Sequence, residues 1–297
     1  MKRFKFLFVT FITSLMISCG TTNTVPITGR KQNLLISDAQ VLSLSNQQYQ
    51  QYLKSAKPSA DITNTAMVKR VGQRLANAVV TYLNNNGLSS EVKEYQWEFN
   101  LIQNKEANAF CMPGGKIVVY EGLLPYTQNE ASLAIVLGHE IAHAVAKHSA
   151  EQMSKQLRAQ YGTEALGLLL NKSGSDTSSL AQEVFGFGAN SMLRKYSRDN
   201  ENEADYMGLI FAAMAGYDPS VALSFWQRMA ESNFSKVPEF FSDHPSDTKR
   251  IAAIQKELPI AMKYYKAIPS NPKNTKTWHF SSSKNNTTKN PTFKQKK

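Results

Sequence analysis

Residues 135–152 read IVLGHEIAHAVAKHSAEQ, an apolar stretch that holds three of the five histidines in the 297-residue chain. Two of these, His139 and His143, form the pattern H-E-x-x-H. On a helix, positions four apart differ by about 40° in direction and about 6 Å in height, so both imidazoles project from one face. Two such rings suit adjacent corners of a tetrahedral Zn²⁺ site. Glu140 lies about 100° round the helix, where it can take a proton from metal-activated water.

The alternative is an ordinary core helix whose histidines are satisfied by hydrogen bonds. The apolar neighbours of the motif argue against this, because a charged cluster on such a helix is costly unless it is paired or bound to metal. His148 lies nine residues after His139, about 180° round the same helix. We therefore expect it outside the ligand set, as an outer-face or supporting histidine that does no chemistry.

A catalytic zinc needs a third protein ligand, and the acidic stretch SRDNENEAD, residues 197–205, offers one. Glu201 and Asp205 are four residues apart, so one can bind the metal while the other holds a ligand histidine by its second ring nitrogen. Glu203 is expected to point away. Taken alone, the same acids are typical of a solvated helix start. Arg198 is a candidate to stabilise the oxyanion of a tetrahedral intermediate, or it simply pairs with an acid.

The chain as a whole predicts an α+β fold, dominated by helices, with a small antiparallel sheet. Apolar residues recur at helical spacing in residues 63–83, whereas residues 95–102 and 116–124 have the pattern of strands. We expect these two strands to pair antiparallel. The strand at 115–120 is expected to bind an extended substrate by strand addition, through the backbone of Gly115, Lys116, Ile117 and Val118.

The first 18 residues have the pattern of a secretory signal peptide. A basic start, MKRFK, precedes a mainly apolar run of 13 residues, which is too short to span a bilayer comfortably. The run ends in LMISCG, which resembles a bacterial lipobox and implies cleavage before Cys19 and lipidation of its thiol. The alternative is a plain signal peptide with an incidental cysteine.

The expected organisation after residue 18 is a lipidated tether over 19–35, one folded domain over 36–266 and a basic, disordered tail over 267–297. The formal net charge of +11 comes from the two ends. Residues 1–5 hold three basic residues and residues 270–297 hold seven lysines, which leaves 34 − 3 − 7 = 24 basic against 23 acidic residues. A nearly neutral core gives no support to nucleic-acid binding.

Three motifs in order carry a resemblance to the M48 family of gluzincin metallopeptidases. They are H-E-x-x-H, then S-R-x-x-E-x-x-A-D, and upstream NAFCMPGGKIVVYEGLL at residues 108–124. The resemblance covers roughly residues 60–255. The lipobox and the opening VPITGRKQ, residues 25–32, resemble the periplasmic lipoprotein branch with BepA- and Oma1-type proteases.

The resemblance implies a zincin-like domain that binds one Zn²⁺ per subunit. Its zinc ligands would be His139, His143 and Glu201, its general base Glu140, and its supporting carboxylate Asp205. The implied activity is a zinc-dependent endopeptidase that cleaves unfolded or misassembled envelope proteins by Glu-assisted attack of zinc-bound water. His244, in an H-P element, resembles a loop histidine that approaches the zinc and occludes it. Alternatively, it caps or contacts the last helix.

A second interpretation is a chaperone-like assembly factor of the periplasm, with a structural or latent zinc site. Three protein ligands beside a glutamate favour an open, catalytic site, whereas a permanent fourth ligand at His244 favours the assembly factor. The expected partners are unfolded envelope polypeptides and a membrane, reached through the N-terminal lipid. The expected location is the outer membrane, facing the periplasm. The sequence specifies neither the natural substrate nor the oligomeric state.

Overall fold

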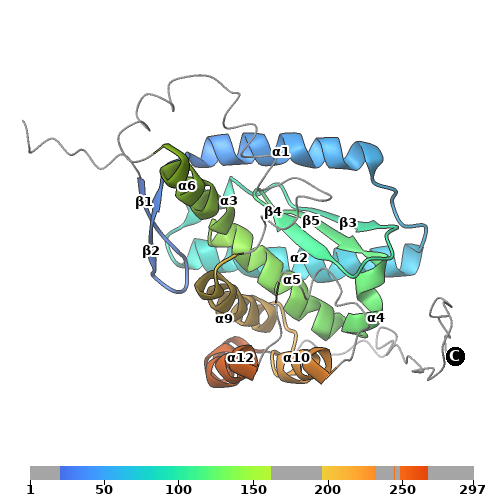
Figure 1. Cartoon of the computed structure of the whole chain (residues 1–297). Coiled ribbons are helices and arrows are strands. Elements are labelled where there is room, and N and C mark those ends of the chain that lie inside the picture. Colours follow the sequence, from blue (N-terminus) through green and yellow to red (C-terminus); the bar gives the residue numbers. More distant parts are fainter. Residues whose placement is uncertain (1–20, 162–195, 232–243, 245–247, 267–297) are drawn as a thin grey trace, which may run out of the picture.

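The computed structural model describes residues 21–161, 196–231, 244 and 248–266. The expected signal peptide, Cys19 and the tail after residue 266 lie outside the described residues. The part of the expected tether that is described forms a β-hairpin, in which β1 (Thr21–Thr24) pairs antiparallel with β2 (Lys31–Leu34). This hairpin lies beside α6 (His148–Tyr161), as Figure 1 shows.

The central sheet has three strands in the order β3 (Glu98–Ile102), β5 (Lys116–Tyr120) and β4 (Ala109–Met112). β5 pairs parallel with β3 and antiparallel with β4, so the expected antiparallel pairing of residues 95–102 with residues 116–124, that is of β3 with β5, is wrong. The hairpin is instead β4–β5, whose turn contains Gly114 and Gly115 at φ 84° and 82°. Those left-handed backbone angles are accessible to glycine without steric cost.

The position of β5 also corrects the expected substrate strand. Both hydrogen-bonding edges of β5 are occupied, by β3 on one side and β4 on the other. Strand addition at Gly115–Val118 is therefore excluded. Within the described part of the chain, β4 pairs with β5 alone, which leaves its outer edge available to an extended peptide.

Helices cover both faces of the sheet. Ile117 and Val119 pack in one core with α2 (Ile62–Asn85) and α5 (Glu130–Val145), whereas Val118 and Tyr120 pack in a second core with α1 (Asp38–Ser55). Alternate side chains of a strand point to opposite faces, so β5 is buried on both. The fold is thus helix-dominated α+β, as predicted, with a mixed sheet.

Two helices meet at the centre of the molecule, α5 and α9 (Arg198–Met214). Asn129 caps the start of α5 by accepting a hydrogen bond from the backbone N–H of Ser132, and Ser197 caps α9 in the same way. Gly138 and Gly208 lie where the helices touch, and a Cβ on Gly138 would lie 2.8 Å from the carbonyl oxygen of Gly208. The two backbones can approach this closely because both positions lack a side chain.

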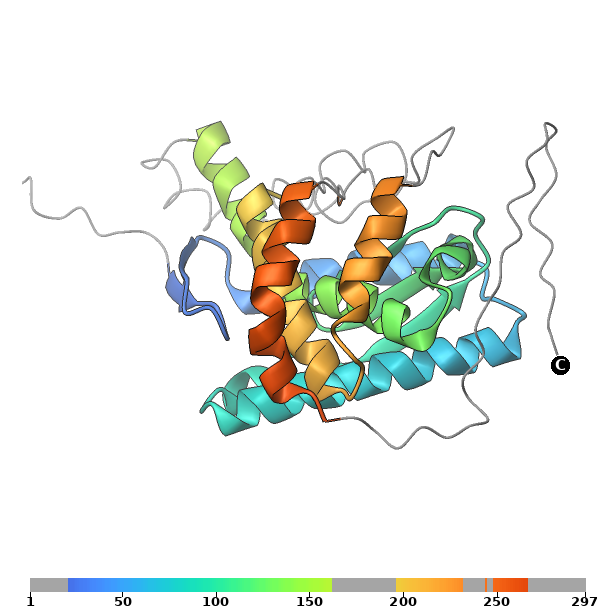
Figure 2. The ribbon, with the colours of Figure 1, turned by 90° about the horizontal axis from the view of Figure 1, so that it is seen from below.

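The remaining elements complete the domain around this pair. α12 (Thr248–Ala261) packs against α9, and α10 (Val221–Glu231) packs against α12 and α5 (Figure 2). The short elements are α3 (Ser89–Val92), η1 (Glu121–Leu123), α4 (Leu124–Thr127) and η3 (Met262–Tyr264). Among the described residues, no helix combines the length and the apolar character that crossing a membrane requires.

Candidate metal centre

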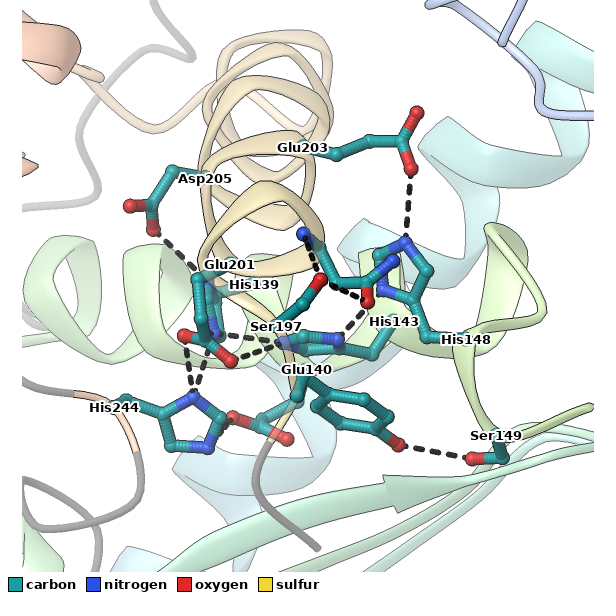
Figure 3. Close-up of polar contacts among 12 residues, drawn as sticks. His139, Glu140, His143, His148, Ser149, Ser197, Glu201, Glu203, Asp205 and His244 are labelled. Atoms are coloured by element: carbon teal, nitrogen blue, oxygen red, sulfur yellow. Dashed lines mark hydrogen bonds and ion pairs between the residues drawn. The ribbon is translucent and has the colours of Figure 1, made fainter. Parts of the chain in front are cut away.

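The packing of α5 on α9 brings four potential ligands together. His139 and His143 come from α5, Glu201 comes from the first turn of α9, and His244 lies opposite them (Figure 3). One ligand atom from each of the four lies within 4.8 Å of all the others. All three residues inferred as zinc ligands are thus part of one buried cluster.

The distances within this cluster fit a tetrahedral zinc site. The two Nε2 atoms of His139 and His143 lie 3.0 Å apart. The carboxylate of Glu201 lies 3.3 Å from the first and 3.4 Å from the second. Ligands bound tetrahedrally at about 2.0–2.1 Å lie about 3.3–3.4 Å from one another.

Two buried carboxylate oxygens support the same interpretation. Oε1 of Glu201 and Oε1 of Glu140 have no hydrogen-bond partner among the described residues. A buried acceptor without a partner costs about 1–3 kcal/mol. A cation between Glu201 and the two imidazoles satisfies one of these atoms directly, so the donor set fits Zn²⁺.

His244 occupies the remaining corner of the cluster. Its Nδ1 lies 3.0 Å from Nε2 of His139 and 2.8 Å from Oε2 of Glu201, and its Nε2 lies 3.5 Å from Oε1 of Glu140. The histidine therefore contacts both the ligand cluster and the candidate base. In this arrangement it fills the position that a substrate carbonyl needs in an open zinc site.

Asp205 holds His139 in place through Nδ1, the ring nitrogen that faces away from the cluster. Nδ1–H of the ring donates to Oδ1 of Asp205 at 2.9 Å, which fixes the ring with Nε2 toward the cluster. Burial alone would raise the pKa of Asp205, but Arg250 and His139 outweigh it and hold that pKa below its ordinary value. Asp205 is therefore an anion that accepts the histidine proton.

Arg250, in α12, is a residue that the sequence analysis missed. Its Nε and Nη2 donate to the two oxygens of Asp205, each at 2.7 Å, and its Nη1 donates to the carbonyl of His244 at 3.1 Å. The guanidinium also lies 3.6 Å from the ring centre of Trp226, a cation–π contact. Arg250 thus links Asp205 to the residue that blocks the fourth corner.

His143 is supported in the same way by His148, which takes the supporting role, one of the two expected for it. Its Nδ1 lies 2.8 Å from Nδ1 of His148, whose Nε2 lies 2.9 Å from Oε2 of Glu203. Glu203 points away from the ligand atoms, as expected, but it is buried and bonded to His148. The geometry differs from a continuous helix because α5 ends at Val145, and Lys147, at φ 54°, turns the chain before α6.

Aromatic packing also holds the imidazole of His143 in place. Tyr196 stacks on His143 with ring centres 4.1 Å apart and an angle of 17° between the planes. Its hydroxyl shares a hydrogen bond of 2.9 Å with Ser149. Arg198, in contrast, occupies an exposed position in the first turn of α9, and its role at an oxyanion stays a prediction.

Glu140 has the environment of a general base. Burial raises the pKa of its carboxyl above the ordinary value, although the nearby His244 and His139 act in the opposite direction. A general base works best when its pKa approaches the working pH. Beside the cluster, a pocket opens between the β4–β5 turn, α1 and the end of α5. Its lining includes Tyr95, Pro113, Gly114 and His143.

The fold and this cluster define a zincin-like metallopeptidase domain. Residues 63–258 match peptidase family M48, and the chain belongs to that family. It is 40% identical over 174 residues to mitochondrial metalloendopeptidase OMA1 of Schizosaccharomyces pombe, covering 58% of this chain and 50% of that protein. It is 30% identical over 271 residues to human OMA1, covering 89% and 50% of the two chains.

A bacterial relative belongs to the same group. The beta-barrel assembly-enhancing protease of Escherichia coli is 28% identical over 237 residues, covering 78% of this chain and 46% of that protein. The chain thus spans about half the length of the curated relatives it matches. Family membership supports a metalloendopeptidase role for the domain.

Proposed function

We propose that this protein is a zinc-dependent endopeptidase that cleaves unfolded or misassembled proteins of the cell envelope. The observation that carries the proposal is the buried Glu140 carboxylate beside a cluster of three ligands. His139, His143 and Glu201 would hold Zn²⁺. Bound zinc polarises a scissile carbonyl and makes a water molecule more acidic.

The protein's own groups then supply the proton transfers. Glu140 takes a proton from the attacking water and passes it to the leaving amine, and its raised pKa suits both steps. Asp205 and His148 each engage the Nδ1 atom of a ligand histidine. Both rings thereby keep Nε2 toward the metal and do not compete with Glu140 for the proton.

The outer edge of β4 is the proposed substrate site, in place of β5. An extended peptide that adds to this edge is bound by main-chain hydrogen bonds, which tolerate many side-chain sequences. The pocket lined by Tyr95, Pro113 and Gly114 lies at the end of β4 and beside His143, where it can accept a substrate side chain. Such recognition suits polypeptides that have lost or not reached their folded state.

The proposed location is the bacterial cell envelope, with a lipid on Cys19 and the domain on the periplasmic side of the outer membrane. The lipobox-like sequence and the similarity to the E. coli protease support this location. The OMA1 relatives are mitochondrial by name. The proposed partners are unfolded envelope polypeptides and the membrane, with no role for nucleic acid.

One observation favours a second candidate, a chaperone-like assembly factor with a structural or latent zinc site. His244 completes four ligands, and closed four-ligand sites are typical of structural zinc. The endopeptidase is the better-supported proposal because Glu140 lies beside the cluster, where a structural site has no need of a base.

Metal removal tests the proposal. The purified protein is expected to hold one Zn²⁺ per chain and to cleave an unfolded substrate such as casein. Chelation should abolish cleavage, and stoichiometric Zn²⁺ should restore it. A protein that binds zinc but cleaves no unfolded substrate, even without the His244 side chain, would favour the assembly factor instead.

His244→Ala is expected to raise the rate of casein cleavage about tenfold, with zinc content unchanged. The rise follows if the histidine occupies the fourth corner in about nine molecules of ten, because only the remaining fraction is competent. Initial rates and metal content, measured on the same samples, check this. His279→Ala, at the fifth histidine of the chain, is the matched control. Equal rates in the wild type and in His244→Ala would eliminate the blocking role.

A further inference from the structure

The tip of the β1–β2 hairpin contacts Glu203, the carboxylate that supports His148 and, through it, His143. Thr28 donates its hydroxyl to Oε1 of Glu203 at 2.5 Å, and Arg30 donates Nε–H to Oε2 of the same carboxylate at 2.9 Å. Both oxygens of Glu203 are therefore bound by residues 175 and 173 positions away in the sequence. Ile27 and Gly29, each at φ 69°, shape the tip on either side of Thr28.

The same tip also binds α6. Nη1 and Nη2 of Arg30 donate to the two oxygens of Glu151 at 3.1 and 2.9 Å. Gln32 donates to Glu151 at 2.9 Å and to the carbonyl of Ala146 at 2.8 Å. One guanidinium thus lies between a carboxylate of α6 and a carboxylate of α9, and a neighbouring amide holds the backbone where α5 gives way to α6.

Glu203 connects the hairpin to His143, a candidate metal ligand, through two further hydrogen bonds. A carboxylate only accepts hydrogen bonds, so Nε2 of His148 carries the proton that it donates to Glu203. A neutral imidazole then has an acceptor at Nδ1, to which Nδ1–H of His143 donates at 2.8 Å. The proton on Nδ1 of His143 leaves its Nε2 as a lone pair, directed at the cluster.

We propose that Arg30 and Thr28 are positioning residues of the metal centre, which act through Glu203 and His148 to fix the orientation and tautomer of His143. The proposal rests on the endopeptidase proposed above, since the ring is positioned for a metal. It is a different claim from the endopeptidase activity, because it gives the hairpin, which supplies no metal ligand, a part in orienting one. A partner bonded directly to a ligand histidine typically changes metal affinity by about 10- to 100-fold, and Arg30 and Thr28 act two hydrogen bonds farther out, so we expect an effect at the lower end of that range.

Zinc affinity, measured by competition with a chromophoric chelator, is the first test. Arg30→Ala removes both a hydrogen bond and an ion pair to Glu203 and is expected to weaken zinc binding about tenfold. Thr28→Val removes a single hydrogen bond to Glu203 and should weaken zinc binding less. Arg30→Lys keeps the charge without the forked donors and should lie between Arg30→Ala and the wild type. Circular dichroism confirms that each variant is folded.

Arg158→Ala is the matched control. Arg158 also joins α6 to the hairpin, through the carbonyl of Asn33 at 2.7 Å, but within the described part of the chain no hydrogen bond or ion pair joins it to Glu203. It should bind zinc as tightly as the wild type. Equal losses in Arg158→Ala and Arg30→Ala would show that the hairpin acts only by general stabilisation, and would overturn the proposal.

A double-mutant cycle tests the route through His148. His148→Phe keeps a ring but removes both nitrogens, and it should weaken zinc binding by itself. In that background Arg30→Ala should cause no further loss, because the connection is already broken. Additive losses in the double variant would contradict the proposed route.

Nuclear magnetic resonance of the metal-free protein separates this proposal from the proposed function. The ring ¹⁵N shifts of His143 should report a proton on Nδ1 in the wild type and in Arg158→Ala, and a mixed tautomer in Arg30→Ala. Absence of zinc binding or of cleavage would refute the endopeptidase, and the tautomer would still decide whether Arg30 positions the ring. Identical His143 shifts in Arg30→Ala and the wild type would overturn the positioning role.

Discussion

Glu140→Gln is expected to bind Zn²⁺ as the wild type does and to cleave casein about 10³-fold more slowly. The amide has almost the shape of the carboxylate but cannot accept a proton, and loss of general acid–base catalysis costs about 10²–10⁴ in rate. Zinc binding should persist because Glu140 lies beside the ligand cluster and is not one of its four members.

The measurement pairs metal content with cleavage rate for each protein. Glu231→Gln makes the same chemical change at an exposed position at the end of α10 and is the matched control. A Glu140→Gln protein that cleaves at the wild-type rate would exclude the proposed mechanism. A variant that loses its zinc would instead place Glu140 among the ligands.

Arg250→Met is expected to lower the free energy of unfolding by about 3–5 kcal/mol. Asp205 and Arg250 are both about 5% exposed at the side chain, and removing one partner of a buried ion pair leaves the other charge without compensation. Methionine keeps much of the aliphatic volume over Trp226, so the cost arises mainly from the lost charge and hydrogen bonds.

Urea denaturation of the metal-free proteins measures this cost. Asp205→Asn removes the charge that Arg250 compensates, so the double variant should be less destabilised than the sum of the two single variants. Lys249→Met, at the exposed neighbouring position, is the control and should change stability by less than about 0.5 kcal/mol. Additive losses would show that the ion pair itself contributes little.

The metal cluster could be predicted from sequence because its spacing is local. His139 and His143 share a helix, and so do Glu201 and Asp205, so helical geometry alone places each pair on one face. The choice of Glu201 over Asp205 as the ligand, and the place of His244, rest on the resemblance to family M48. The packing of α5 on α9 comes from the fold. The α+β class followed from the same local patterns.

The errors arose where the outcome depends on nonlocal contacts. The expected antiparallel pairing of residues 95–102 with 116–124 is wrong because residues 109–112 form the antiparallel partner of β5, and the alternation pattern does not distinguish them from a loop. His148 was placed on a helix continuous with His139, whereas the left-handed Lys147 redirects the chain. Arg250 was missed because its partner Asp205 lies 45 residues earlier, and no short motif links the two.

The contact between Gly138 and Gly208 has a consequence for how the domain tolerates change. A Cβ on Gly208 would lie 2.7 Å from the backbone nitrogen of His139, so the main chains touch next to a ligand. Direct contact between the two backbones therefore sets the distance between α5 and α9, the helices that carry the ligands. An alanine at either glycine would force apart the two helices that carry the metal site.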